Sequence, residues 1–186
     1  MEPYVKNPLF LTQGKRFTNF DMLVREAWAN WLITVVIQKI TGDRQTFGEK
    51  KDGDGVVWNV DKQNGFVVEH VCAMDYPAGK QLPTGEERII WAVEHKIKRG
   101  PEYAKDKALV VFFDGAKKFY RSKIREAIYK RHNFKIVFCV GLLEIKDGAY
   151  SYIVSEFRDT FKDRSVSHIV YVNQDFTDWQ IKQQME

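Results

Sequence analysis

Apolar residues recur at helical spacing in the first strongly patterned part of the chain, residues 19–42. The apolar positions are Phe20, Leu23, Val24, Ala27, Trp28, Trp31, Leu32, Val35, Val36 and Ile40. Asn19 is a suitable cap for the start of a helix here, and Gly42 is a suitable end. Because the apolar face is broad, we expect a sheet or a partner helix to cover it.

Two further segments carry helical patterns. Thr84 is placed to cap a helix over residues 86–100, whose inward positions are Ile89, Ile90, Val93 and Ile97. Residues 121–133 form an amphipathic pattern in which basic residues surround a narrow apolar stripe. The chain therefore supplies at least three helices that need a surface to pack against.

Strand patterns separate these helices. Residues 57–71 predict a β-hairpin, and the apolar runs at 108–115 and 134–145 are typical of strands buried on both faces. Asp147-Gly148 predicts a turn into a strand over residues 149–157, and residues 168–174 suit a last strand.

The order of these elements predicts one domain over residues 1–186, with an irregular arm over 1–18 and a polar, helical tail over 175–186. We expect an α/β (α+β) fold in which helices pack on a mixed sheet. The expected core has the order αβββαβ and carries a C-terminal β-hairpin extension.

Composition is that of a soluble globular protein, with 44% hydrophobic and 29% charged residues. We expect no membrane association, because no apolar run approaches the roughly 18 residues that span a bilayer. Cys72 and Cys139 lie in apolar surroundings far apart, which favours reduced core residues of a cytoplasmic protein. Trp28 and Trp31 suit the core and also offer a surface for a homo-oligomer.

The turn of the hairpin decides which side chains share a face. A two-residue Asn64-Gly65 turn places Glu69 among apolar residues, whereas a three-residue loop over 63–65 moves it to a mixed face. We prefer the three-residue loop, because it separates an almost wholly apolar face from a mixed one. Asp61 then becomes a diagonal neighbour of Glu69, while His70 belongs to the core.

Two neighbouring carboxylates repel, so Asp61 and Glu69 either share a proton or hold a cation. Oxygen ligands favour Mg²⁺ or Mn²⁺. A solvated strand face explains the same pattern without a metal, and both interpretations stay open.

The chain has a net charge of +4. Positive charge is concentrated between Lys96 and Lys135, a segment with thirteen basic and four acidic residues. Such an excess attracts DNA or RNA, although solvated helix faces also collect Lys and Arg. The residues expected to contact nucleic acid are Lys117, Lys118, Arg121, Lys123, Arg125, Lys130 and Arg131.

The element order and these residues resemble the PD-(D/E)XK nuclease superfamily, which has the restriction-endonuclease-like fold. The resemblance covers residues 19–115. It implies that Glu26 is the helical acid, that Asp61 is the hairpin aspartate and that Glu69 is the motif glutamate. Asp54 is a second candidate for the hairpin aspartate, although it lies far from the predicted turn.

The Lys of the motif is replaced by Val71. Some members of the superfamily carry this Lys on the following helix, which nominates Lys96 or Lys98, and Lys96 lies nearer the apolar stripe. The resemblance implies a hydrolase that cleaves phosphodiester bonds with a metal held by Asp61 and Glu69. If no Lys reaches Glu69, the likeness is one of fold alone, and the alternative is a non-enzymatic binding or oligomerising module.

Overall fold

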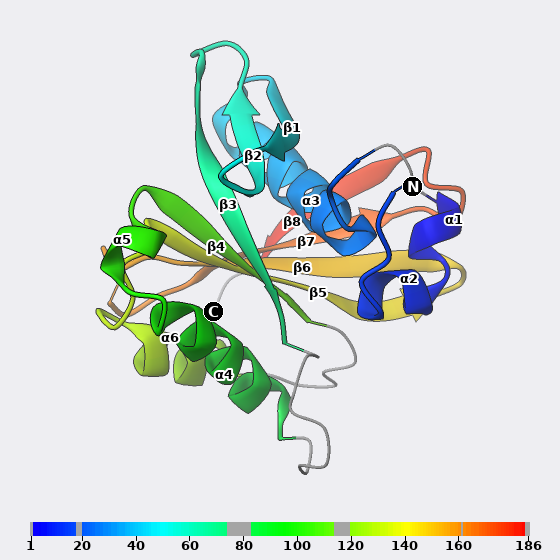
Figure 1. Cartoon of the computed structure of the whole chain (residues 1–186). Helices are drawn as coiled ribbons and strands as arrows, with labels where there is room; N and C mark the ends of the chain where they lie inside the picture. Colours follow the sequence, from blue (N-terminus) through cyan, green and yellow to red (C-terminus); the bar gives the residue numbers. More distant parts are fainter. Residues whose placement is uncertain (1, 18–19, 74–82, 114–119, 161, 185–186) are drawn as a thin grey trace.

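Eight strands form one sheet in sequence order, β1 to β8 (Figure 1). The computed structural model describes residues 2–17, 20–73, 83–113, 120–160 and 162–184. The strands are β1 (Gln45–Lys50), β2 (Gly53–Asn59), β3 (Asn64–Cys72), β4 (Lys107–Phe113), β5 (Ile136–Lys146), β6 (Ala149–Phe157), β7 (Val166–Val172) and β8 (Trp179–Gln184). β4 pairs in parallel with β3 and with β5, and all other neighbours are antiparallel.

Helices pack on both faces of this sheet. They are α1 (Glu2–Val5), α2 (Pro8–Thr12), α3 (Val24–Thr41), α4 (Gly85–Ile97), α5 (Pro101–Ala104) and α6 (Arg121–Ile128). One apolar core lies between α3 and the sheet, and a second lies between the sheet and α4 with α6. The predicted α+β class with a mixed sheet is therefore confirmed, and α3, β1–β3, α4 and β4 follow the expected αβββαβ order. None of the helices described is both long enough and apolar enough to span a bilayer.

The sheet covers the broad apolar face of α3. This was one of the two expected coverings, the other being a partner helix. Leu32 and Ile33 are fully buried, and each contributes roughly 1.5–3 kcal/mol through burial. Gly42 ends the helix in the left-handed conformation, with φ of 74°, which a glycine adopts without strain. The helix begins at Val24, and the proposed cap Asn19 lies outside the described residues.

Both ends of the chain differ from the expectation. The arm over residues 1–18 contains α1 and α2, and the tail contains β8 instead of a helix. β8 pairs with β7 along the edge of the sheet, where Ile181 is partly buried and the other residues of the strand are exposed. Hydrophobic patterning therefore carries little information about this strand, because neither of its faces is buried.

Both predicted registers of the β2–β3 hairpin were wrong. Asn59 pairs with Asn64, so the connection is a four-residue loop over residues 60–63, in which Gln63 takes a positive φ of 53°. Gly65 lies within β3, opposite Trp58. A Cβ atom there would lie 2.3 Å from the carbonyl oxygen of Val57, so this glycine allows a close approach of two strands and does not form a turn.

Candidate active site

β2 and β3 separate at one end of their ladder, where a carboxylate replaces a backbone acceptor. The last paired residues are Gly55 and Val68, and beyond them the backbone N–H of His70 donates to Asp54 Oδ2 at 2.6 Å. The next positions on the two strands are Asp54 and Glu69. The structure thus places Asp54, the second candidate for the hairpin aspartate, beside the segment that carries Glu69.

Glu69 lies on the face of β3 that α4 covers, and only 6% of the residue is exposed. Lys107 Nζ donates to its Oε1 at 2.6 Å, and the Tyr103 hydroxyl donates to its Oε2. Lys96 Nζ lies 3.6 Å from Oε2. Burial by itself would raise the pKa of Glu69, but the contacts with Lys107, Tyr103 and Lys96 hold this pKa below its ordinary value.

The ring of Tyr103, on α5, is surrounded by three cations. The charged groups of Lys107, Arg99 and Lys96 lie 4.7, 4.9 and 5.5 Å from its centroid. Lys96 also donates to the tyrosine hydroxyl at 2.9 Å. Burial and the hydrogen bond to Glu69 raise the pKa of Tyr103, so the hydroxyl keeps its proton and links the two charged groups.

Lys96 reaches the site from α4, as the sequence predicted for a Lys that replaces Val71. It is 8% exposed, whereas Lys98 is exposed to solvent. Burial lowers the pKa of Lys96, and the neighbouring carboxylates of Asp54 and Glu69 oppose this shift. A buried Lys that lies near two acids and has a perturbed pKa is a common feature of functional sites.

Glu26 joins the site from the first turn of α3. Its Oε2 accepts a hydrogen bond from the backbone N–H of Leu23 at 2.7 Å, so the carboxylate caps the helix. Burial raises the pKa of Glu26, and the nearby Asp54 raises it further. α3 therefore contributes Glu26, which caps the helix and lies near Asp54.

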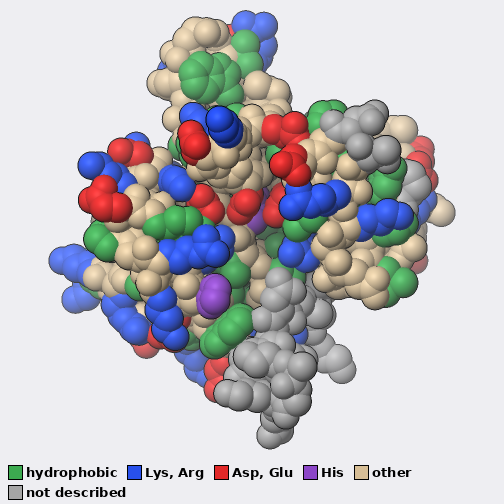
Figure 2. All heavy atoms as spheres, in the orientation of Figure 1, with side chains coloured by type: hydrophobic (Ala, Val, Ile, Leu, Met, Phe, Trp, Pro, Cys, Tyr) green, Lys and Arg blue, Asp and Glu red, His purple; other side chains and the backbone are tan. Residues whose placement is uncertain are grey.

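Two cavities meet at Glu26. The α4 cavity has a volume of about 290 Å³, and the β1–β2 cavity one of about 250 Å³. The α4 cavity is lined by Arg25, Glu26, His70, Val71, Cys72, Trp91, His95, Lys96 and Phe112. The β1–β2 cavity is lined by Arg16, Asp21, Met22, Glu26, Glu49, Lys50, Lys51, Gly53 and Asp54. On this face of the molecule, acidic side chains and a histidine lie in a central hollow with Lys and Arg around it (Figure 2).

The possible metal ligands near the hollow are carboxylate oxygens, the ligand type that Mg²⁺ and Mn²⁺ prefer. They are not gathered around one point, and within the described ranges no three His, Cys, Asp or Glu side chains form a group spaced to hold a metal. Lys107 and Tyr103 occupy both oxygens of Glu69, and His70 N–H occupies one oxygen of Asp54. Both carboxylates are therefore held by groups of the protein itself.

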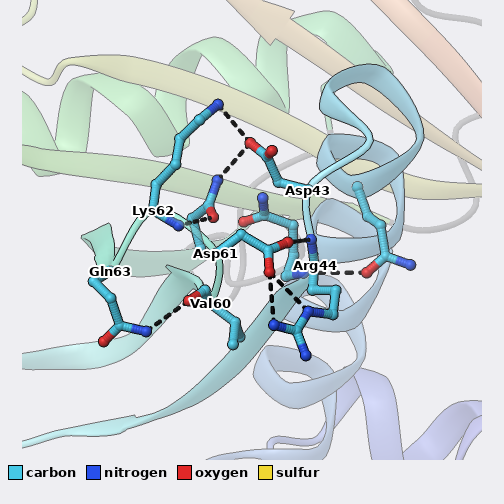
Figure 3. Close-up of polar contacts among 9 residues, drawn as sticks. Asp43, Arg44, Val60, Asp61, Lys62 and Gln63 are labelled. Atoms are coloured by element: carbon cyan, nitrogen blue, oxygen red, sulfur yellow. Dashed lines mark hydrogen bonds and ion pairs between the residues drawn. The ribbon is translucent and has the colours of Figure 1, made fainter.

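Asp61 lies elsewhere, at the tip of the hairpin (Figure 3). Arg44 donates to it from Nε at 2.8 Å and from the backbone N–H at 2.6 Å, and these bonds lower the pKa of Asp61. Glu69 is five residues along β3 from the tip, or roughly 15–20 Å at 3.3 Å per residue. The predicted neighbourhood of Asp61 and Glu69 was wrong, because the turn lies at residues 60–63, before the expected Asn64-Gly65, so Asp61 is part of the loop itself. Asp61 is thus not positioned for the catalytic and metal-binding roles expected of it.

The described residues of the predicted basic surface do not line the site. Lys117 and Lys118 lie outside the described residues. The other five positions (Arg121, Lys123, Arg125, Lys130 and Arg131) lie on or just after α6, and none of them lines either cavity. Lys123 pairs with Glu86 at 3.1 Å and Arg131 pairs with Glu94 at 3.0 Å, so acids of α4 neutralise part of this charge.

Two predictions concern the packing of His70 and of the tryptophans of α3. His70 is a core histidine, as expected: it is 7% exposed, and its Nε2 lies 2.9 Å from Asn30 Oδ1. Trp28 stacks on Trp31 with centroids 4.8 Å apart, and Trp31 contacts Trp179 edge-on. These rings pack largely within the chain, and assembly through them stays a prediction.

Sequence reasoning missed Tyr103 and Lys107 and ranked Asp54 too low. One signal was available for Lys107, which directly precedes the apolar run of β4 and so begins a strand that must lie inside the sheet. Asp54 stands between Gly53 and Gly55, and a Cβ at Gly55 would lie 2.7 Å from Asn30 Nδ2 on α3. Glycine at this position therefore indicates close packing at the point where the strands separate.

No family model, curated protein or solved structure matches this chain.

Proposed function

We propose that this protein is a metal-dependent nuclease that hydrolyses phosphodiester bonds in nucleic acid. The observation that carries the proposal is that Glu26, Lys96 and Asp54 line two cavities that meet at Glu26. Lys96 lies 3.6 Å from Glu69, and Asp54 bonds the backbone of the residue after Glu69. A helical acid, an acid on each hairpin strand and a Lys are the parts that the PD-(D/E)XK resemblance implies. The Lys comes from α4 in place of Val71.

In this proposal Asp54 and Glu69 would hold Mg²⁺ or Mn²⁺, which carboxylate oxygens suit, and Asp54 takes the role first expected of Asp61. When bound, such a metal polarises the phosphoryl group and lowers the pKa of a bound water. Lys96 then supplies a fixed positive charge beside the phosphate that develops negative charge. Glu26 holds the start of α3 in place and adds negative charge at the junction of the two cavities.

Lys107 and Tyr103 hold the Glu69 carboxylate. A buried carboxylate needs a compensating partner, and two Lys side chains and one hydroxyl provide it here. A nuclease of this kind, with two buried thiols, suits the cytoplasm.

Cleavage of a labelled oligonucleotide and of supercoiled plasmid tests the proposal. We expect cleavage with Mg²⁺ or Mn²⁺, none with EDTA, and at least a ~100-fold loss of rate in Glu69→Gln and in Lys96→Met. Glu144→Gln and Lys98→Met are the matched controls, because both positions are exposed. Circular dichroism and thermal melting show whether each variant is folded.

Two results contradict the proposal. One is the absence of cleavage with every divalent metal in a protein that is folded and stable. The other is equal cleavage by wild type and Glu69→Gln, which would identify a contaminating nuclease as the source.

One observation favours the alternative of a non-enzymatic binding module. The contacts of Glu69 with Lys107, Tyr103 and Lys96 also tie β3 to β4, α5 and α4, and this role needs no chemistry. Under that alternative, Glu69→Gln lowers the free energy of unfolding and no condition gives cleavage.

A further inference from the structure

The α4 cavity continues the proposed catalytic hollow into a space of a different character. It shares Glu26 and Lys96 with the catalytic residues, and its remaining walls are mainly apolar and aromatic. Val71, which stands in the place of the motif Lys, forms part of this wall. The substitution that removes a Lys from β3 therefore leaves an apolar surface beside the reacting groups.

Two rings on α4 form one side of the cavity. Trp91 and His95, one turn apart, stack with centroids 5.8 Å apart and an interplanar angle of 27°. His95 is exposed and Trp91 is partly buried, so the pair extends from the cavity to the surface. Flat, stacked rings of this kind accept a further planar ring by stacking.

The charges of the cavity suit an anionic ligand with a neutral ring. Arg25 and Lys96 line it from α3 and α4. Positive charge thus lies beside Glu26, while Val71 and Cys72 form an apolar wall on β3.

The volume of about 290 Å³ falls just below the ~300–1,000 Å³ of pockets that bind drug-sized molecules. A single nucleotide is of this size, whereas a duplex is not. A base can enter only after it leaves its stack and its pairing partner, which is easiest in a single strand.

We propose that the α4 cavity binds an unpaired nucleobase, and that the substrate is therefore single-stranded nucleic acid or a single-stranded end. This inference rests on the proposed nuclease function and adds the substrate class. The base stacks against Trp91 and His95, and its phosphate lies toward Lys96, which also contacts Glu69. The aromatic wall then favours single-stranded over double-stranded nucleic acid, and the carboxylates act on the neighbouring phosphodiester bond.

Binding measured without cleavage tests this inference separately from catalysis. Fluorescence anisotropy of a labelled 12-nucleotide single strand and of the matching duplex, at one fixed salt concentration with EDTA, gives two dissociation constants. We expect the single strand to bind at least ~10-fold more tightly. Trp91→Ala should weaken single-strand binding roughly 5- to 150-fold, the range for loss of one stacked base, and leave duplex binding unchanged.

Three variants keep the test decisive. Trp91→Phe keeps a flat ring and should bind like wild type within a few-fold. Trp58→Ala, at an exposed tryptophan that lines neither cavity, is the matched control and should not change binding. If Trp91→Ala does not fold, His95→Ala at an exposed position takes its place and should also weaken single-strand binding.

Equal affinity for single strand and duplex, or equal effects of Trp91→Ala and Trp58→Ala, would overturn the inference. Metal-dependent cleavage that requires Glu69 would in that case leave the nuclease proposal intact. Conversely, selective single-strand binding that depends on Trp91, without any cleavage, would support the base site and remove the catalytic function.

Discussion

Replacement of Lys107 by Met removes the shortest ion pair of Glu69 while it keeps most of the volume of the side chain. Loss of one partner of a buried ion pair costs ~3–5 kcal/mol. The Lys107 side chain is 20% exposed, and Glu69 keeps Lys96 at 3.6 Å and the Tyr103 hydroxyl. We therefore expect a smaller loss, about 2 kcal/mol at pH 7, or roughly 4–8 °C in Tm for a chain of this length.

Urea unfolding followed by circular dichroism measures this difference. Lys135→Met is the matched control, because Lys135 pairs with Asp106 at 3.1 Å on an exposed surface and should contribute at most ~0.5 kcal/mol. If Lys107→Met is no more destabilising than Lys135→Met, Lys107 does not hold Glu69 in place.

The effect of Lys107→Met should also depend on pH. The pKa of Glu69 is lowered in the folded protein, so its contacts stabilise the fold above the ordinary value of 4.5. This contribution is lost as the pH falls through the folded pKa, because Glu69 then takes up a proton. The difference between wild type and Lys107→Met should therefore be full at pH 7 and shrink below pH 4.5. A difference that does not change with pH would indicate that lost packing, and not the ion pair, is responsible.

Three further predictions concern Tyr103, His70 and the packing of the hairpin. Tyr103→Phe removes the hydroxyl that bonds Glu69 and should lower the free energy of unfolding by about 1–2 kcal/mol in urea; no change would show that this bond is not formed. His70 should show no NMR titration between pH 8 and 4.5, because its pKa is about 3 in the fold and 6.5 when unfolded. Stability linked to His70 should accordingly fall as the pH drops from 6.5 toward 3, whereas ring signals that titrate near 6.5 would contradict its burial. Gly65→Ala should destabilise by ~1–3 kcal/mol through a clash with the backbone of β2, and Gly48→Ala, with open space around it, should not; equal effects would contradict the observed register.

The main elements were readable from the sequence because their apolar residues follow the period of the element that buries them. α3 and α4 end within a few residues of the predicted positions, and the strands at β4, β5 and β6 match the apolar runs. β8 could not be read in this way, because an edge strand with two exposed faces has no apolar alternation.

The hairpin register was misread because one signal has two physical causes. Asn64-Gly65 is a common turn sequence, yet here the glycine is needed for a close contact between strands. The true loop over residues 60–63 contains no glycine and places Gln63 at a positive φ, which composition does not reveal. Because of that error, Asp61 instead of Asp54 was expected to lie beside Glu69.

The contacts around Glu69 could be foreseen only in part. Lys96 was predicted from its position beside the apolar stripe of α4, and it does reach Glu69. Tyr103 and Lys107 are brought in by α5 and by the parallel pairing of β3 with β4. Their meeting depends on how separate elements pack, and no local spacing in the sequence encodes it.

We propose that Asp54, and not Asp61, acts together with Glu69 in a metal-dependent site. The Mg²⁺-dependent cleavage rates of Asp54→Asn and Asp61→Asn on the same oligonucleotide test this pairing. We expect at least a ~100-fold loss for Asp54→Asn and a rate within about two-fold of wild type for Asp61→Asn. Full activity in Asp54→Asn, or a large loss confined to Asp61→Asn, would contradict it.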